Sequence, residues 1–179
     1  MNTSAPEQRF GRLAPTLTLF CGLPGSGKST LAKRLEADGR GVRLCTDDWQ
    51  AMLGMDHTDT AFHDHLQSAL YRHGLTLLRH GVSVILEDGL WTSAERKEKF
   101  AGARDCGALI DLHIFEVPFD TLRARLGLRN REAATGAYPM TDEQLRWAWD
   151  LFQAPSTEEL AAVDFCAVHP GGLDDVPSR

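Results

Sequence analysis

The stretch Gly22-Leu23-Pro24-Gly25-Ser26-Gly27-Lys28-Ser29 decides the fold, because it matches the phosphate-binding pattern G-x-x-x-x-G-K-[ST]. The pattern is informative only between a strand and a helix, and the sequence predicts both. Residues 16–21, TLTLFC, have the composition of a buried strand, and apolar side chains recur at helical spacing from residue 30 to 35. The glycines let consecutive backbone N–H groups surround a polyphosphate, Lys28 reaches its outer phosphates, and the Ser29 hydroxyl is placed to ligate Mg²⁺. A glycine-rich turn that binds nothing would need neither the Lys-Ser pair nor a following helix.

Length and composition predict one domain. The chain has 179 residues, of which 42% are hydrophobic, enough to bury one good core. It has no apolar run of roughly 18 residues and no signal-like start, so we expect a cytoplasmic protein without a membrane partner. Its four cysteines lie far apart without a C-x-x-C pair, which favours buried free thiols over disulfides or a zinc site. We expect a flexible start at 1–13, a domain at 14–169 and a flexible tail at 170–179.

The net charge of −6 is unevenly distributed along the chain. From Asp142 to Asp175 there are eight acidic residues and one arginine, so the rest of the chain is close to neutral. A protein that clamps long nucleic acid usually has a basic stripe. A small or short anionic substrate fits this charge distribution better.

Strands and helices alternate after the phosphate-binding stretch. Further strands are predicted at 42–45, 82–86, 109–117 and 165–168. Capping boxes at Thr92, Thr141 and Ser156 mark the starts of three of the helices. This alternation predicts an α/β fold, with a parallel sheet covered by helices on both faces. In such sheets a ligand lies beyond the carboxyl ends of the strands.

Three aspartates follow the carboxyl ends of the second and third predicted strands. Phosphoryl transfer needs cations around the transferred group and often a carboxylate that deprotonates the attacking hydroxyl. Asp47 suits the carboxylate role, and Asp88 suits the magnesium shell or a contact to Lys28. Helix N-capping is the alternative for both Asp47 and Asp48. Glu87 is interpreted as an ordinary residue at the end of a strand.

Cations for the same site are expected from the helix at 121–131. Arg125 and Arg129 are four residues apart and share a face, and guanidinium groups match phosphate oxygens well. Arg123 is better explained as part of a solvated face. The helix leads into a loop at about 129–141 that could close over a nucleotide as a lid.

Two other groups of side chains have simpler explanations. His57, His63 and His65 lie among aspartates, but residues two apart on a helix point to different sides, which argues against a shared metal ion. A role in lining the substrate is more plausible for them. Trp147 and Trp149 are interpreted as core packing of a late helix.

Four motifs, in this order, resemble the P-loop kinase family. The family includes bacteriophage polynucleotide 5′-kinase, small bacterial kinases and enzymes similar to zeta toxins and chloramphenicol phosphotransferase. The motifs are GLPGSGKST at 22–30, TDDW at 46–49, VILED at 84–88 and VPFDTLRARLGLR at 117–129. The resemblance covers about residues 16 to 165. It implies a three-layer α/β/α P-loop NTPase fold, with five parallel strands in the order 2-3-1-4-5 and a small lid. It also implies ATP as donor, Mg²⁺ and a hydroxyl acceptor.

The resemblance also implies a role for each matching residue. Asp47 matches the general base, Lys28 and Ser29 the phosphate and magnesium contacts, and Asp88 the acid after the third strand, beside the lysine. The lid arginines match Arg125 and Arg129. The nucleotide-binding residues implied by the first motif are Gly22, Leu23, Pro24, Gly25, Ser26, Gly27, Lys28, Ser29 and Thr30.

One departure from the family bears on the acceptor. Polynucleotide kinases of this type tend to have an arginine three residues after the base, and this chain has Gln50 there. A kinase of a small hydroxyl-bearing molecule is therefore favoured. A 5′-hydroxyl polynucleotide or nucleoside kinase is the alternative, and a nucleotide-bound regulatory module without an acceptor is a third possibility. The acceptor's identity, the choice of ATP or GTP, the oligomeric state and the choice between Asp47 and Asp48 as base stay open.

Overall fold

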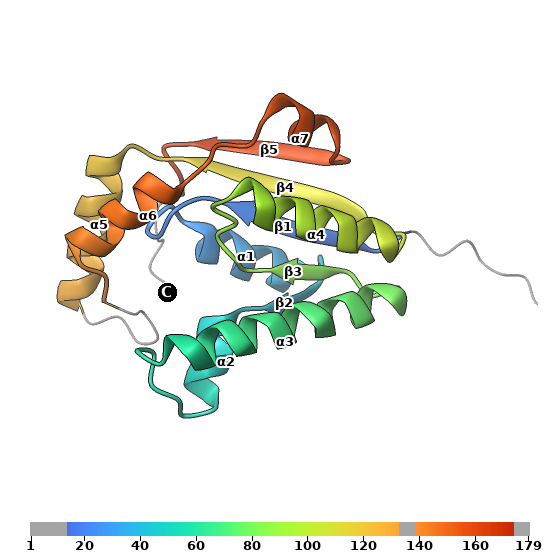
Figure 1. Cartoon of the computed structure of the whole chain (residues 1–179), viewed down its shortest axis with the longest axis horizontal. Coiled ribbons are helices and arrows are strands. Elements are labelled where there is room, and N and C mark those ends of the chain that lie inside the picture. Colours follow the sequence, from blue (N-terminus) through green and yellow to red (C-terminus); the bar gives the residue numbers. More distant parts are fainter. Residues whose placement is uncertain (1–13, 133–138, 174–179) are drawn as a thin grey trace, which may run out of the picture.

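Five strands form one parallel sheet in the computed structural model, which describes residues 14–132 and 139–173 (Figure 1). The strands are β1 (Thr16–Cys21), β2 (Val42–Leu44), β3 (Val84–Leu86), β4 (Leu109–Glu116) and β5 (Phe165–Pro170). Their order in the sheet is β2-β3-β1-β4-β5, and every neighbouring pair is parallel. This order confirms the fold that the family resemblance implied.

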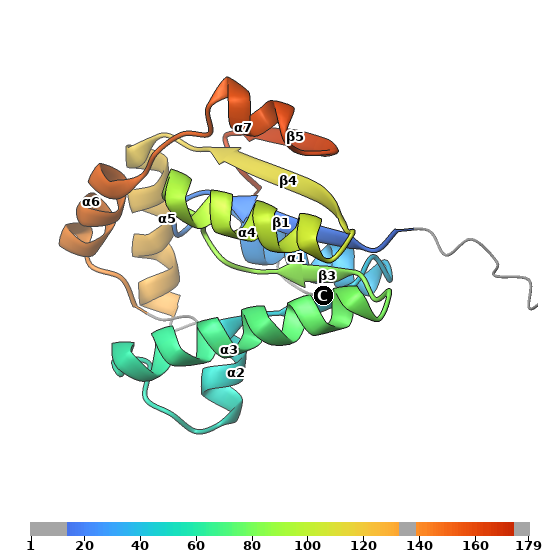
Figure 2. The same cartoon turned by 45° about the vertical axis from the view of Figure 1, so that its right-hand side comes forward.

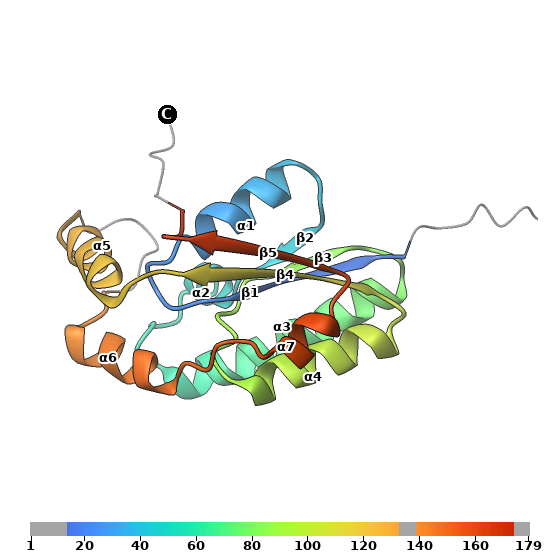
Figure 3. The same ribbon diagram turned by 90° about the horizontal axis from the view of Figure 1, so that it is seen from above.

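Helices cover both faces of the sheet. They are α1 (Lys28–Ala37), α2 (Thr46–Met52), α3 (Thr60–Arg79), α4 (Ser93–Asp105), α5 (Phe119–Glu132), α6 (Asp142–Leu151) and α7 (Thr157–Ala161). Figure 3 shows α1 on one face of the sheet and α3, α4 and α7 on the other, which gives three layers. The capping boxes at Thr92, Thr141 and Ser156 are all present, so the three helix starts predicted from them are confirmed.

Alternation along the central strands explains the two halves of the core. On β1, Leu17 and Leu19 face the cluster that includes Tyr71 of α3 and Phe100 of α4. Phe20, between Leu19 and Cys21, belongs to the second cluster, on the α1 side. Thr18, which alternates with Leu17 and Leu19, is also buried, so β1 is covered on both of its faces.

The carboxyl ends of the five strands lie at one edge of the sheet, because all the strands run in the same direction. Figure 2 shows α5 and α6 on one side of this edge, and α2 and the start of α3 on the other. The predicted flexible start at 1–13, residues 174–179 of the predicted tail and residues 133–138 of the predicted lid fall outside the described residues. Among the helices of the described ranges, none is long and apolar enough to cross a membrane.

Candidate active site

The phosphate-binding loop connects β1 to α1, as the motif predicted. Gly25 and Gly27 have φ values of 79° and 96°, in the region where a side chain is strained. Gly27 occupies the N-cap position of α1, and no side chain caps the helix there. The first N–H groups of an uncapped helix are orphaned donors next to the positive end of the helix dipole, which suits an anionic ligand.

Two contacts fix the first residue of this loop. The N–H of Gly22 donates to the backbone oxygen of Gly89 at 2.9 Å, and the Trp91 indole Nε1–H donates to the backbone oxygen of Gly22 at 3.2 Å. Both partners belong to the segment that follows β3. This segment therefore determines where the phosphate-binding loop begins.

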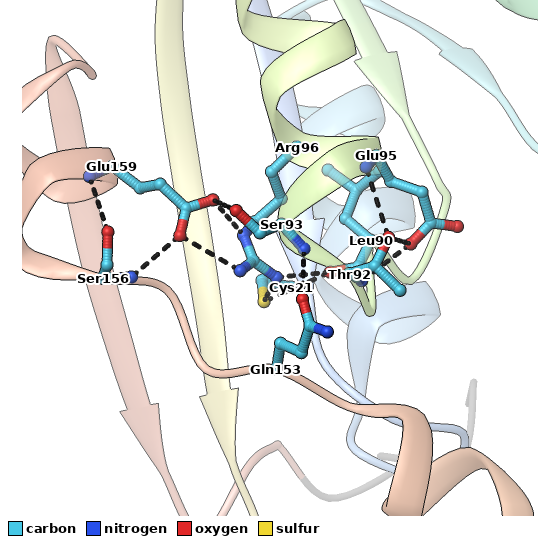
Figure 4. A network of polar contacts seen from close by, with 9 residues as sticks. All are labelled: Cys21, Leu90, Thr92, Ser93, Glu95, Arg96, Gln153, Ser156 and Glu159. Carbon is cyan, nitrogen blue, oxygen red and sulfur yellow. Dashed lines mark hydrogen bonds and ion pairs between the residues drawn. The ribbon is translucent and has the colours of Figure 1, made fainter.

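The segment after β3 is in turn held by a buried arginine (Figure 4). Arg96 of α4 is fully buried and donates from Nη1 to the backbone oxygen of Leu90 at 3.1 Å. Leu90 has a φ of 41°, the one positive value among the described residues other than glycine. Glu159 of α7 accepts from Arg96 Nε at 2.9 Å and from Nη2 at 3.2 Å. Sequence reasoning missed this network, because nothing local in the sequence pairs residues 96 and 159.

Charged groups from several elements of the site act on Lys28. Its ammonium donates to the backbone oxygen of Leu23 at 2.8 Å. Desolvation lowers the pKa of Lys28 to about 8, since burial disfavours the charged form. The negative charges of Glu87 and Asp47 raise this pKa, and the positive charge of Arg129 lowers it. Asp47 and Arg129 thus both lie within electrostatic range of the lysine.

Arg43 distinguishes Asp47 from Asp48, the two candidates for the general base. Its guanidinium binds three carboxylates: Glu36 at 3.0 Å, Asp48 and Glu87. Asp48 is therefore held in an ion pair. Asp47 points elsewhere, with 59% of its side chain exposed. Neither aspartate caps α2, because Cys45 occupies the N-cap position without a side-chain hydrogen bond.

Glu87 has a larger role than sequence reasoning gave it. It was interpreted as an ordinary strand-end residue, but its side chain is only 5% exposed and is bound by Arg43. Its charge is the strongest of those that act on the pKa of Lys28. An apolar strand followed by an acid does not by itself indicate this role, since Arg43 reaches Glu87 only across the pairing of β2 with β3.

His63 is the histidine that the structure brings to Asp47, with its Nδ1 3.7 Å from Oδ1 of that aspartate. The same Nδ1 lies 3.0 Å from Oε1 of Gln50. Gln50 is fully buried and donates from Nε2 to the backbone oxygen of Asp56 at 2.7 Å. Gln50, the position at which the family resemblance implied a departure from polynucleotide kinases, is thus committed to contacts within the protein. His65 is exposed.

Asp88 is 6% exposed, and burial raises its pKa. A hydrogen bond from Gln67 and the charges of Lys99 and His63 lower that pKa. Its Oδ2 is buried and makes no hydrogen bond to the part of the chain that the structure describes.

A magnesium ion fits the donors that this end of the sheet offers. Asp88 supplies a carboxylate oxygen, and the Ser29 hydroxyl lies on the exposed first turn of α1. Within the described ranges, no cluster of three or more acidic, histidine or cysteine side chains could hold a metal ion. Proteins usually ligate Mg²⁺ through one or two oxygen ligands together with substrate phosphates.

The predicted arginines lie on α5 as expected. Arg125 and Arg129 are half-buried, whereas the Arg123 side chain is 52% exposed and lies 3.5 Å from Asp120. The interpretation of Arg123 as part of a solvated face is therefore confirmed. At the base of the predicted lid, the Asn130 amide donates to the backbone oxygen of Met140 at 2.8 Å and so joins the two flanks of the lid.

A segment that sequence reasoning assigned to the tail reaches the phosphate-binding loop. The N–H of Leu173 donates to the backbone oxygen of Ser26 at 3.2 Å. A Cβ added at Gly172 would lie 2.9 Å from Nη1 of Arg125, and one added at Gly27 would lie 2.4 Å from the backbone oxygen of Leu173. Gly172 and Leu173, which follow β5, thus pack against the phosphate-binding loop.

The expectation that Trp147 and Trp149 are core residues is wrong. They are 63% and 41% exposed, because Leu145 and Ala148 occupy the buried face of α6. The Trp147 ring packs edge-on against Trp91, with the ring centroids 6.0 Å apart. The exposed side chain therefore lies next to the residue that anchors Gly22.

Comparison with known proteins agrees with the fold. The sequence profile of the AAA domain family (AAA_33) matches residues 17–155. No curated protein sequence matches the chain. A proposed kinase from Chloroflexus aurantiacus superposes with a TM-score of 0.68 and 18% identity, covering 89% of this chain and 87% of that chain.

Two further solved structures have the same fold. Kti12 from Chaetomium thermophilum, in complex with ADP-AlF3, has a TM-score of 0.65 and 16% identity, covering 90% of this chain and 91% of that chain. A gluconokinase from Sinorhizobium meliloti has a TM-score of 0.58 and 16% identity, covering 91% of this chain and 86% of that chain. At such identities the likeness establishes the fold.

Proposed function

Since this chain belongs to the AAA domain family, we propose that it is an ATP-dependent kinase that transfers the γ-phosphate to a hydroxyl of a small molecule. Asp47 is the general base of this proposal. The observation that carries it is that the two neighbouring aspartates differ in their contacts. Arg43 binds Asp48 in an ion pair, whereas Asp47 is exposed and lies within electrostatic range of Lys28 in the phosphate-binding loop.

The transfer step follows from the residues around the loop. Asp47 takes the proton of the acceptor hydroxyl as that oxygen bonds to the γ-phosphorus, and the bond from this phosphorus to the bridging oxygen of ADP breaks. Lys28, Arg125 and Arg129 stabilise the negative charge on the transferred group. Ser29 and Asp88 would hold a magnesium ion, which when bound neutralises phosphate charge.

A 5′-hydroxyl polynucleotide or nucleoside kinase is the second candidate, supported by the resemblance in motif order. The burial of Gln50 weighs against it, since this position offers no cation to a nucleic-acid phosphate. A nucleotide-bound regulatory module is the candidate of another class. It would bind ATP and hydrolyse it slowly without any acceptor.

The test is an acceptor screen with radiolabelled ATP, covering sugars, aminoglycosides, nucleosides and oligonucleotides, on wild type, Asp47→Asn and Asp48→Asn. With the best acceptor, Asp47→Asn should lower transfer by about 100-fold or more, because a general base contributes roughly that much. ATP affinity should stay within about twofold, since the base acts in the chemical step. Asp48→Asn, the matched control, should retain transfer.

The outcomes separate the candidates. Transfer retained by Asp47→Asn would remove Asp47 from the role of base. Slow hydrolysis with every acceptor would favour the regulatory module. Preference for oligonucleotides would favour the polynucleotide kinase.

A further inference from the structure

The wall of the site opposite α5 has an unusual charge distribution. It is built from α2 and the first half of α3 (Figure 2). From residue 44 to residue 71 the sequence contains five aspartates and three histidines, but no lysine and no arginine. All of these residues are described by the structure, so the wall that carries Asp47 offers no permanent cation to a ligand.

Two of the cations next to this wall are committed to partners within the protein. Arg43 binds three carboxylates, and the Arg43 side chain is only 11% exposed. Lys99 lies over the Tyr71 ring, with its Nζ 3.7 Å from the ring centroid, and pairs with Glu98 at 3.3 Å. Arg129, from the opposite side, acts on Lys28 and so belongs to the phosphate end of the site.

His63 is the polar group that this wall presents beside Asp47, with 32% of its side chain exposed. The Gln50 amide fixes the orientation of the ring: its Nε2 donates to Asp56, so its Oε1 accepts from Nδ1–H of His63. Nε2 is then the ring atom that can accept a hydrogen bond from a ligand hydroxyl.

From this arrangement we infer that the phosphate acceptor is a hydroxyl compound without a phosphate or carboxylate group, oriented by His63 beside Asp47. The inference rests on the proposed kinase function and specifies the class of its acceptor. An anionic acceptor would meet the exposed carboxylate of Asp47 on a wall that itself contains no lysine or arginine. A neutral polyol or an amino alcohol meets no such repulsion, and its amine would be attracted. The charge distribution along the sequence favoured a small or short anionic substrate, and ATP, the other substrate of the proposed reaction, is such a molecule.

The experiment compares acceptors in pairs that differ by one anionic group. The pairs are D-glucitol and D-gluconate, adenosine and adenosine 3′-monophosphate, and glucosamine and glucosamine 6-phosphate. Acceptor-dependent ADP formation is measured for each compound. Binding of each compound to the wild-type protein saturated with a non-hydrolysable ATP analogue and Mg²⁺ is measured by calorimetry. Within a pair, the non-anionic member should be favoured by about tenfold or more.

Failure of the inference differs from failure of the proposed function. Equal or stronger binding of the anionic members would overturn the inference, whether or not transfer occurs. Preferential binding of the non-anionic members without any transfer would support the inference and count against the kinase activity.

A charge substitution tests the part assigned to His63. His63→Arg should reduce the preference for non-anionic acceptors at least fivefold, because it adds the missing permanent cation beside Asp47. His73→Arg adds the same charge at an exposed position farther along α3 and should leave the preference unchanged. An equal effect of the two variants would overturn the role of His63.

Discussion

The Arg96 guanidinium and the Glu159 carboxylate form a buried ion pair that joins α4 to α7, with Nε 2.9 Å from Oε1. The hydrogen bond from Arg96 lowers the pKa of Glu159 to about 2. The same guanidinium holds Leu90, next to the residue that binds Gly22. The pair therefore links the last helix of the fold to the phosphate-binding loop.

Breaking this pair should destabilise the protein strongly. Arg96→Met leaves Glu159 as a buried charge without its partner, which costs about 3 kcal/mol or more. The double variant Arg96→Met with Glu159→Leu should be less destabilised than Arg96→Met alone, because it leaves no unpaired charge. Urea denaturation at pH 7 measures both. An Arg96→Met variant as stable as wild type would show that the ion pair with Glu159 does not stabilise the fold.

Arg104 provides the matched control. It also joins α4 to the end of the chain, through an ion pair with Asp164 at 2.6 Å, but its side chain is 43% exposed. Arg104→Met should therefore cost about 1 kcal/mol or less. It makes no described contact with Leu90, so nucleotide affinity should fall in the Arg96 variant and not in the Arg104 variant.

Acid should weaken the same contact. Because the folded-state pKa of Glu159 is depressed from 4.5 to about 2, its contribution is fully present above pH 4.5 and is lost as the pH falls toward 2. The loss amounts to about 3 kcal/mol. Glu159→Gln should remove this part of the acid sensitivity, and denaturation measured at several pH values checks it.

Nucleotide affinity should fall at alkaline pH because of Lys28. Desolvation lowers its pKa to about 8, so above pH 8 the lysine is mostly neutral in the protein without nucleotide. Phosphate binding favours the charged form, and the affinity for ADP should decrease by up to about tenfold per pH unit between pH 8 and 10. Calorimetric titration with ADP measures the slope. Lys28→Met should bind more weakly and show no such slope; a slope that persists in this variant would assign the effect to another group.

The sequence allowed the fold to be predicted because its signals are local. The phosphate-binding motif lies within eight residues, and each capping box within four, so no knowledge of the tertiary structure was needed to read them. The contacts of Arg43 with Glu87 and of Leu173 with Ser26 depend on how distant segments meet at the end of the sheet. No periodicity or spacing in the sequence reports such contacts.

The exposure of Trp147 also depends on tertiary packing that the sequence pattern does not report. Its apolar neighbours favoured burial, but Leu145 and Ala148 fill the available space under α6. Hydrophobic composition predicts that a helix has a buried face, and only packing against the neighbouring elements decides which residues occupy it.

Alanine at Gly27 should disturb the contact between the loop and the chain end. Its φ is 96°, and a Cβ there would lie 2.4 Å from the backbone oxygen of Leu173. Gly39 is the control, since its φ of 70° is also positive but nothing lies within 4 Å of an added Cβ. Gly39→Ala should cost about 1 kcal/mol, and Gly27→Ala more than about 2 kcal/mol. Ending the Gly27→Ala chain at Gly172 should recover most of the difference in urea denaturation; no recovery would rule out Leu173 as the cause.

Phenylalanine at Trp91 should weaken nucleotide binding while preserving the aromatic packing. The substitution keeps a ring next to Trp147 but removes the indole N–H that donates to Gly22 at 3.2 Å. The buried backbone oxygen of Gly22 then loses this partner, at a cost of about 1–3 kcal/mol, and the loop is less firmly placed. We expect the ADP affinity to fall by about tenfold and the ADP-dependent change in tryptophan fluorescence to decrease. Trp149→Phe is the control: that ring contacts Phe119, 5.4 Å away between centroids, and has no described contact with the loop, so its affinity should match wild type. Equal affinities for the two variants would mean that the indole hydrogen bond does not position the loop for nucleotide.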